Sequence, residues 1–311
     1  MKELYHICLT AHSEVLLRDI DDVRMMTNLS ALSAWRTDTD ILTDSIMSTH
    51  MHFTIMSQDP YKFIRNQRFS IAKAFNYKYN RKGGLFDPDP FALKITGPHH
   101  TQMELNYSLR QGMHHGITET PFSYPWSTCN HLFVSERGAE PEKPVFRTRA
   151  EVQSCLSKNT DFPDEWQADA NGIILRPTFE QLKLVETWYG TARSYIFSMI
   201  RRTTDEWLAE QEKDANESPI ITLESLERGY SKEDVANMLS NERSPKYIQR
   251  GPSDMEICST IDHQLLGRFG KTSVYELSLK GKERIARELL SSPHINSAAQ
   301  VSRCLAMKYD L

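Results

Sequence analysis

The residues with the clearest chemical potential are two histidines, His50 and His52, which flank a single apolar residue. They begin an alternating polar and apolar stretch, residues 50–56, of the kind that predicts a β-strand. Because residues i and i+2 of a strand project from the same face, the two imidazoles should lie side by side. Paired imidazoles on a rigid strand form half of a divalent-metal site. An edge strand with two exposed histidines would give the same pattern.

A second stretch, residues 106–111, places Tyr107 and Gln111 four residues apart and therefore on one face of a helix. The amide oxygen of Gln111, added to two imidazoles, gives a donor set that suits Mg²⁺ or Mn²⁺. A cation there would polarise a phosphate and stabilise a phenolate, which tyrosine needs because its ordinary pKa is about 10. Tyr107 could then attack a DNA phosphodiester and hold the cut strand as a phosphotyrosine, ready for rejoining. A half-buried structural tyrosine is the alternative. Four more histidines could supply a ligand: His99, His100, His114 and His115.

The elements that must position these residues alternate along the first part of the chain. Strands are predicted at 4–10, 41–47, 50–56 and 93–96, and helices at 19–35, at 59–79 and after Gly97-Pro98. This order is that of an α+β, ferredoxin-like antiparallel sheet with helices on one face. The histidines and the Tyr107 helix should then lie on the open face, as a shallow site accessible to a long polymer.

Composition narrows the class of protein. The chain has 311 residues and a formal net charge of −4, so any nucleic-acid contact must come from a local basic patch. Its five cysteines show no C-x-x-C pair, which suits a reducing cytoplasm without disulfides. No stretch is long and apolar enough for a membrane span, and no signal sequence is recognisable, so we expect a cytoplasmic protein. The candidate phosphate contacts, which an ordinary solvated helix face would also explain, are Arg65, Arg68, Lys73, Arg81, Lys82 and Arg110.

The chain is expected to divide into three parts. Residues 1–135 form the catalytic domain, 136–176 a linker or surface extension, and 177–311 a mainly helical C-terminal region with a helix from 179 to about 212. Two short basic helices are predicted near 278–290 and 296–307. They could form a DNA-binding helix-turn-helix, although a packed helical hairpin is the commoner outcome.

Four motifs resemble those of the single-tyrosine HUH transposases, which include the REP-associated tyrosine transposases and related insertion-sequence enzymes. In chain order, the similar segments are Ser45–His52, Phe75-Asn76 with Gly83–Phe86, Tyr107–Gly116, and Tyr124-Pro-Trp-Ser127. The resemblance covers residues 4–130. It departs from the family at Gln111-Gly112, where Asn-Pro is frequent.

The resemblance implies that His50, His52 and Gln111 bind Mg²⁺ or Mn²⁺ and that Tyr107 is the nucleophile. It further implies a single-stranded DNA endonuclease and strand transferase that forms a 5′-phosphotyrosine on hairpin or palindromic elements, as a monomer or a homodimer. One alternative is a sequence-specific DNA-binding protein with the same fold and little catalysis. Another is a histidine–metal phosphodiesterase in which water attacks and Tyr107 is dispensable.

Overall fold

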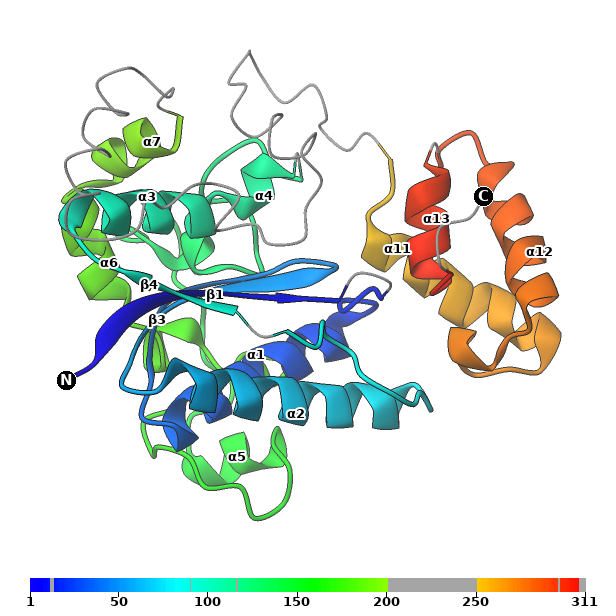
Figure 1. Ribbon diagram of the computed structural model, residues 1–311, viewed down its shortest axis with the longest axis horizontal. Coiled ribbons are helices and arrows are strands. Elements are labelled where there is room, and N and C mark those ends of the chain that lie inside the picture. Colours follow the sequence, from blue (N-terminus) through cyan, green and yellow to red (C-terminus); the bar gives the residue numbers. More distant parts are fainter. Residues whose placement is uncertain (12–13, 90, 116, 201–250, 296, 308–311) are drawn as a thin grey trace.

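The computed structural model describes residues 1–11, 14–89, 91–115, 117–200, 251–295 and 297–307 (Figure 1). Its centre is a sheet of four antiparallel strands in the order β2-β3-β1-β4. The strands are β1 (Glu3–Thr10), β2 (Asp40–Ile46), β3 (His50–Ser57) and β4 (Phe91–Ile95). This order confirms the ferredoxin-like α+β plan that the sequence predicted.

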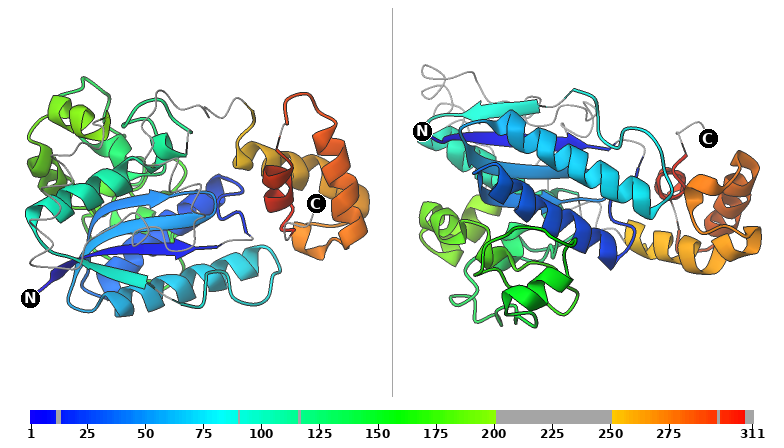
Figure 2. Two further views of the ribbon diagram at one scale, coloured as in Figure 1. Left: turned by 45° about the horizontal axis from the view of Figure 1, so that its top comes forward. Right: turned by 90° about the horizontal axis from the view of Figure 1, so that it is seen from below.

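Two long helices cover one face of the sheet, α1 (Ile20–Arg36) and α2 (Pro60–Lys78). They lie side by side beneath the strands (Figures 1 and 2). Each begins at an aspartate whose carboxylate accepts a backbone N–H of the first turn, Asp19 for α1 and Asp59 for α2. Their apolar sides pack on the strands through a core that includes Ile7, Phe53, Phe63 and Phe75.

The other face of the sheet is also covered, so the expectation of an open, shallow site was wrong. Three helices lie over it: α3 (Pro98–Leu109), α6 (Leu182–Tyr189) and α7 (Ala192–Ile200) (Figure 1). Leu42 of β2 packs there with Leu105 of α3 and Tyr195 of α7 in a second apolar core. His50 and His52 are consequently only 2% and 0% exposed. The physical reason is that residues beyond 120 return to bury apolar surface on this face.

Residues 136–176, predicted as a linker or surface extension, pack against the outer side of α1. They contain one short helix, α5 (Arg149–Ser154). Phe162, Trp166 and Ile174 form an apolar cluster with Ala31 and Leu32 of α1. These contacts favour an extension of the first domain over a free linker.

The predicted C-terminal region, 177–311, does not form one unit in its described part. Helices α6 and α7 pack on the sheet, and the helix expected from 179 to 212 is interrupted at Gly190, whose φ of 74° ends α6. Residues 201–250 of this prediction lie outside the described residues. Residues 251–295 and 297–307 form a separate helical unit at one end of the sheet (Figure 2).

This terminal unit contains α11 (Asp254–Thr260), α12 (Leu279–Leu290) and α13 (Ala298–Cys304). The last two confirm the helices predicted near 278–290 and 296–307. Arg18 joins the unit to the first domain, since its guanidinium donates to Asp262 and to the carbonyl of Cys304. No disulfide joins any of the five cysteines, all of which lie in the described ranges. Among the described residues, no helix combines the length and apolar character that a bilayer span requires.

We predict that Phe162→Ala lowers the free energy of unfolding by about 3–5 kcal/mol, because the ring is fully buried against α1 and its removal leaves a cavity. Urea denaturation measures the change. Val145→Ala, at an exposed position of the same segment, is the control and should cost well under 1 kcal/mol. Equal effects of the two substitutions would contradict the packing of 136–176 on α1.

Candidate active site

Strand β3 brings His50 and His52 together as the sequence predicted. Their ring centroids lie 4.7 Å apart in an edge-to-face arrangement. Strand β1 pairs with β3 so that His6 lies opposite Thr54 and Cys8 opposite His52. Because directly opposed residues of antiparallel strands share a face, His6 joins the same side of the sheet, and its ring stacks on His52 at 5.5 Å.

Helix α3 brings Tyr107 against these histidines. The tyrosine ring meets His52 edge-on at 5.3 Å and His6 at 5.6 Å. The helix begins at Pro98, after Gly97, whose φ of 87° is a conformation that glycine adopts without strain. Tyr107 lies in its last turn and is 7% exposed. The nucleophile and metal-ligand candidates therefore share one buried cluster.

Gln111 stays close to Tyr107 although the helix does not run through it. Helix α3 ends at Leu109, and Gln111 begins the short helix α4 (Gln111–His114). The Gln111 side chain nevertheless donates from Nε2 to the Tyr107 carbonyl at 3.1 Å. Its Oε1 is buried and accepts no hydrogen bond from the described residues. A buried acceptor without a donor is costly, so this oxygen is suited to a ligand.

Gly112, the departure from the family pattern, has a packing reason. A Cβ placed there would lie 2.5 Å from Cβ of Tyr124, so no larger residue fits without movement. Tyr124 belongs to the Tyr-Pro-Trp-Ser motif, and its hydroxyl donates to the Ile46 carbonyl at 2.7 Å. The glycine thus allows the motif to pack directly behind Gln111.

Sequence reasoning missed two members of the cluster, His6 and Glu104. His6 Nδ1 lies 2.9 Å from Glu104 Oε1, and Thr54 Oγ1 donates to the same carboxylate at 2.7 Å. All three residues are fully buried. Two signals could have found them: Glu104 precedes Tyr107 by three residues on one helix face, and His6 begins an i, i+2, i+4 row of polar residues in β1.

The four additional histidines have different positions. His115 lies against His50, with ring centroids 5.1 Å apart. His99 and His100 belong to the first turn of α3, where His100 Nδ1 is 3.0 Å from the Thr96 carbonyl. The side chain of His114 lies outside the described residues.

The donor set fits a divalent cation only if an amide oxygen is included. No group of three or more His, Cys, Asp or Glu side chains in the described ranges is arranged as metal ligands. His50 and His52 supply two imidazoles, and Gln111 supplies the buried oxygen that lacks a donor. Nitrogen and neutral oxygen donors together are compatible with Mn²⁺ or Mg²⁺.

The predicted phosphate contacts do not gather around this cluster. Arg65, Arg68 and Lys73 lie on α2, on the opposite face of the sheet. The Arg81 guanidinium pairs with Glu14 at 2.8 Å and donates to the carbonyl of Gly84. Lys82 is exposed in the turn after α2. Arg110 separates α3 from α4, and burial lowers the pKa of its guanidinium.

Comparison with known proteins gives two similar solved structures. No protein-family model and no curated protein matches the chain. A REP-associated tyrosine transposase bound to a REP hairpin is 15% identical, with a TM-score of 0.37, over 45% of this chain and 82% of that one. A putative transposase from Deinococcus radiodurans is 14% identical, with a TM-score of 0.28, over 33% of this chain and 87% of that one. Both are described as transposases, the class that the motifs in residues 4–130 resemble.

A buried ion cluster attaches the covering segment to the sheet beside the site. Arg176 Nη2 lies 2.9 Å from Asp44 Oδ1 on β2, and Arg176 Nε lies 3.0 Å from Glu180 Oε1. All three side chains are buried. Burial, reinforced by the negative charge of Asp44, raises the pKa of the Glu180 carboxyl well above its ordinary value.

We predict that Glu180→Gln becomes more stable relative to the native chain as the pH rises. The pKa of the Glu180 carboxyl in the folded chain exceeds the unfolded value of about 4.3. The protonated carboxyl therefore contributes its full stability below the unfolded pKa, and this stability is lost as the pH rises through the folded-state pKa. The difference in unfolding free energy should therefore grow from pH 4 upward, by at most about 1.4 kcal/mol per pH unit. Urea titrations at several pH values measure it. Glu140→Gln, at an exposed position, is the control, and its difference in unfolding free energy should stay nearly constant with pH. A constant difference for Glu180→Gln would contradict the raised pKa of Glu180.

Proposed function

We propose that this protein cleaves and rejoins single-stranded DNA, with Tyr107 as the nucleophile that forms a 5′-phosphotyrosine. The observation that carries this proposal is the packing of the Tyr107 ring on His52, whose ring lies against His50, together with the buried Gln111 side chain that donates to the Tyr107 carbonyl. An isolated structural tyrosine would not need three polar partners of this kind in one buried cluster. The motif resemblance to single-tyrosine HUH transposases supports the same reaction.

The proposed reaction exchanges one phosphate ester for another. The Tyr107 Oη–P bond forms as the P–O3′ bond breaks, and the phenolic proton ends on the departing 3′ hydroxyl. His50, His52 and Gln111 would hold a Mg²⁺ or Mn²⁺ ion, whose Lewis acidity polarises the phosphate. Tyr107 keeps the 5′ end of the strand attached, so a second 3′ hydroxyl can reverse the exchange without ATP.

Burial of the cluster serves the same chemistry. The phosphotyrosine must persist until a second 3′ hydroxyl attacks it, and hydrolysis by water would compete with that attack. Helices α3, α6 and α7 exclude solvent from this face of the sheet, since Tyr107 is almost fully covered. A dry site also strengthens the charge interactions that stabilise the transition state.

The proposed substrate is single-stranded DNA that carries a hairpin or palindrome, as the motif resemblance implies. The transposase structure similar to this chain is itself described with a REP hairpin. We further propose action as a monomer or a homodimer, in a transposase or a domesticated relative of one.

A second candidate is a DNA-binding protein with the same fold and little catalysis. The limited exposure of Tyr107 favours it, because a phosphate must reach the hydroxyl before any cleavage occurs. Formation of a covalent adduct separates the two candidates.

We predict that Tyr107→Phe abolishes the covalent adduct because it removes the attacking oxygen. The native chain, incubated with hairpin-containing single-stranded DNA and Mn²⁺, should give a species that resists denaturation on a gel. Tyr77→Phe, a surface tyrosine of α2, is the control and should retain the adduct. Strand cleavage by Tyr107→Phe without adduct would instead assign the attack to water and make Tyr107 dispensable.

We also predict that Gln111→Leu weakens Mn²⁺ binding at least tenfold, a value in the range of about 10- to 100-fold seen when metal-site partners are lost. Leucine keeps the volume and removes the acceptor oxygen. Equilibrium dialysis with Mn²⁺ detected by electron paramagnetic resonance measures the affinity without reference to activity. Gln102→Leu, on helix α3, is the control and should bind Mn²⁺ normally. Unchanged binding by Gln111→Leu would exclude it as a ligand.

A further inference from the structure

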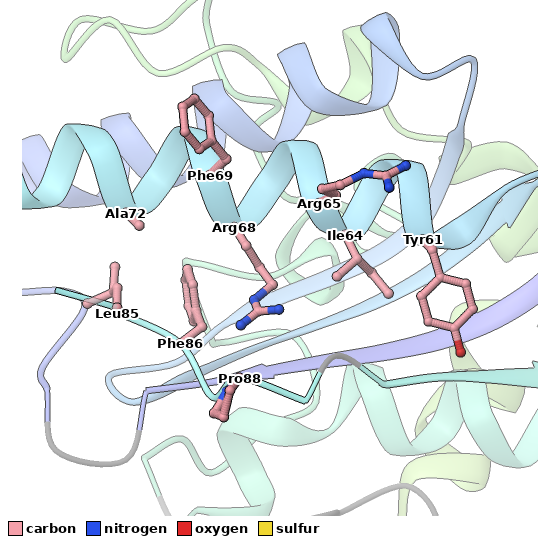
Figure 3. Close-up of a pocket in the computed structure, with 10 residues that line it drawn as sticks. Tyr61, Ile64, Arg65, Arg68, Phe69, Ala72, Leu85, Phe86 and Pro88 are labelled. Atoms are coloured by element: carbon pink, nitrogen blue, oxygen red, sulfur yellow. The ribbon is translucent and has the colours of Figure 1, made fainter.

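A pocket of about 470 Å³ lies on the face of the sheet opposite Tyr107, between α2 and residues 84–88 (Figure 3). Ile64 and Leu85 contribute apolar walls, and both also belong to the core of the domain. Arg68 extends from α2 toward residues 85–88 and donates to the carbonyl of Asp87, which ties this segment to the helix. Such a volume is in the range of small-ligand pockets.

Two exposed aromatic side chains stand at the rim of this pocket. Tyr61 is 51% exposed and Phe69 is 69% exposed, and both belong to α2. They lie about two helical turns apart. In Figure 3 the Tyr61 ring extends from α2 to the side on which residues 85–88 lie, whereas the Phe69 ring points away from that segment. Large aromatic rings left in water on a concave surface are typical of binding sites for flat, stacking ligands.

The charge of the pocket is one-sided. Arg65 and Arg68 line it, and none of the other described residues that line it is acidic. Within the described part of the chain, no residue forms an ion pair or hydrogen bond with the Arg65 side chain, which reaches along the helix toward Tyr61. A ligand that satisfies the pocket must therefore combine a flat apolar surface with negative charge. An unpaired nucleotide has both, because its base can stack and its phosphates are anionic.

We propose that this pocket holds one unpaired base of the DNA substrate, stacked on Tyr61, with Arg65 and Arg68 contacting the adjoining phosphates. The proposal rests on the proposed function, since it concerns the same DNA. It assigns the pocket a role in recognition, because the sheet separates it from Tyr107. Segment 84–88 leads into the edge strand β4, which in turn leads to α3, so a strand passing around this edge can reach both faces.

The test uses the full chain carrying Tyr107→Phe, so that binding is measured without cleavage. The probe is a fluorescent hairpin oligonucleotide with a single-stranded flank. A series of variants of this oligonucleotide replaces each unpaired nucleotide in turn with an abasic site. Fluorescence anisotropy at fixed salt gives the affinities. One abasic position should weaken binding about fivefold or more, the effect of losing one base–aromatic stack.

Tyr61→Ala should weaken binding of the intact probe by a similar factor and remove the dependence on that abasic position. Tyr61→Trp should restore both, which separates stacking from any change in folding. The matched control is Tyr77→Ala, an aromatic residue of α2 that is 91% exposed and does not line the pocket. Arg65→Gln should reduce the salt dependence by about 0.7 of a log unit per log unit of salt, and Lys62→Gln is its control on the same helix.

The outcomes separate this proposal from the proposed function. If Tyr61→Ala binds like Tyr77→Ala and no abasic position matters, the base pocket is excluded, while the Tyr107 adduct remains as evidence for nicking. If Tyr61→Ala lowers the affinity for fully paired DNA as much as the affinity for the flanked hairpin, the contact is to phosphates alone, and the base pocket is again excluded. Failure of the protein to bind any single-stranded probe would overturn both.

Discussion

The polar layer buried between the sheet and α3 determines the geometry of the whole site. On this face the sheet presents His6, Thr43 and Thr54 where a ferredoxin-like sheet could carry apolar residues. A buried polar group without a partner costs about 1–3 kcal/mol, so the helix that covers this face must provide matching groups. Helix α3 does so with Glu104, which accepts from Thr54, and with Ser108, whose hydroxyl lies 2.9 Å from that of Thr43. These contacts fix the rotation of the helix, and Tyr107, next to Ser108, is thereby held against His52.

The parts of the fold that local sequence signals specify could be predicted. Alternation defines the strands, and an N-terminal aspartate marks the start of α1 and of α2, so the ferredoxin-like order follows from residues 3–109. The spacing of Tyr107 and Gln111 is an instructive case. The prediction assumed one continuous helix, and the helix ends at Leu109. Their proximity survives because the Gln111 amide donates to the Tyr107 carbonyl, the same i to i+4 relation that a helix would provide.

The cover over the second face could not be predicted, because it depends on contacts between residues far apart in the chain. Arg176 binds Asp44, which lies more than 130 positions earlier in the chain. The sequence alone does not distinguish a buried arginine from an exposed one, and most arginines are exposed. For the same reason residues 136–176, rich in proline and charge, indicated a linker although Phe162 and Trp166 are buried against α1. His6 was overlooked because the polar row that it begins in β1 does not show by itself which other strand it lies beside. Only the pairing of β1 with β3 shows that it shares a face with His52.

The edge strand β4 connects the two surfaces that we propose to contact DNA. It is only five residues long, about 16 Å, and it pairs on one side alone, with β1. The segment before it lines the pocket on α2, and the helix after it carries Tyr107. A movement of this strand along β1 by one register would turn its side chains to opposite faces, so its backbone pairing with β1 holds both surfaces in one fixed relation. The proposed recognition on one face and the proposed chemistry on the other would then be positioned by the same short element.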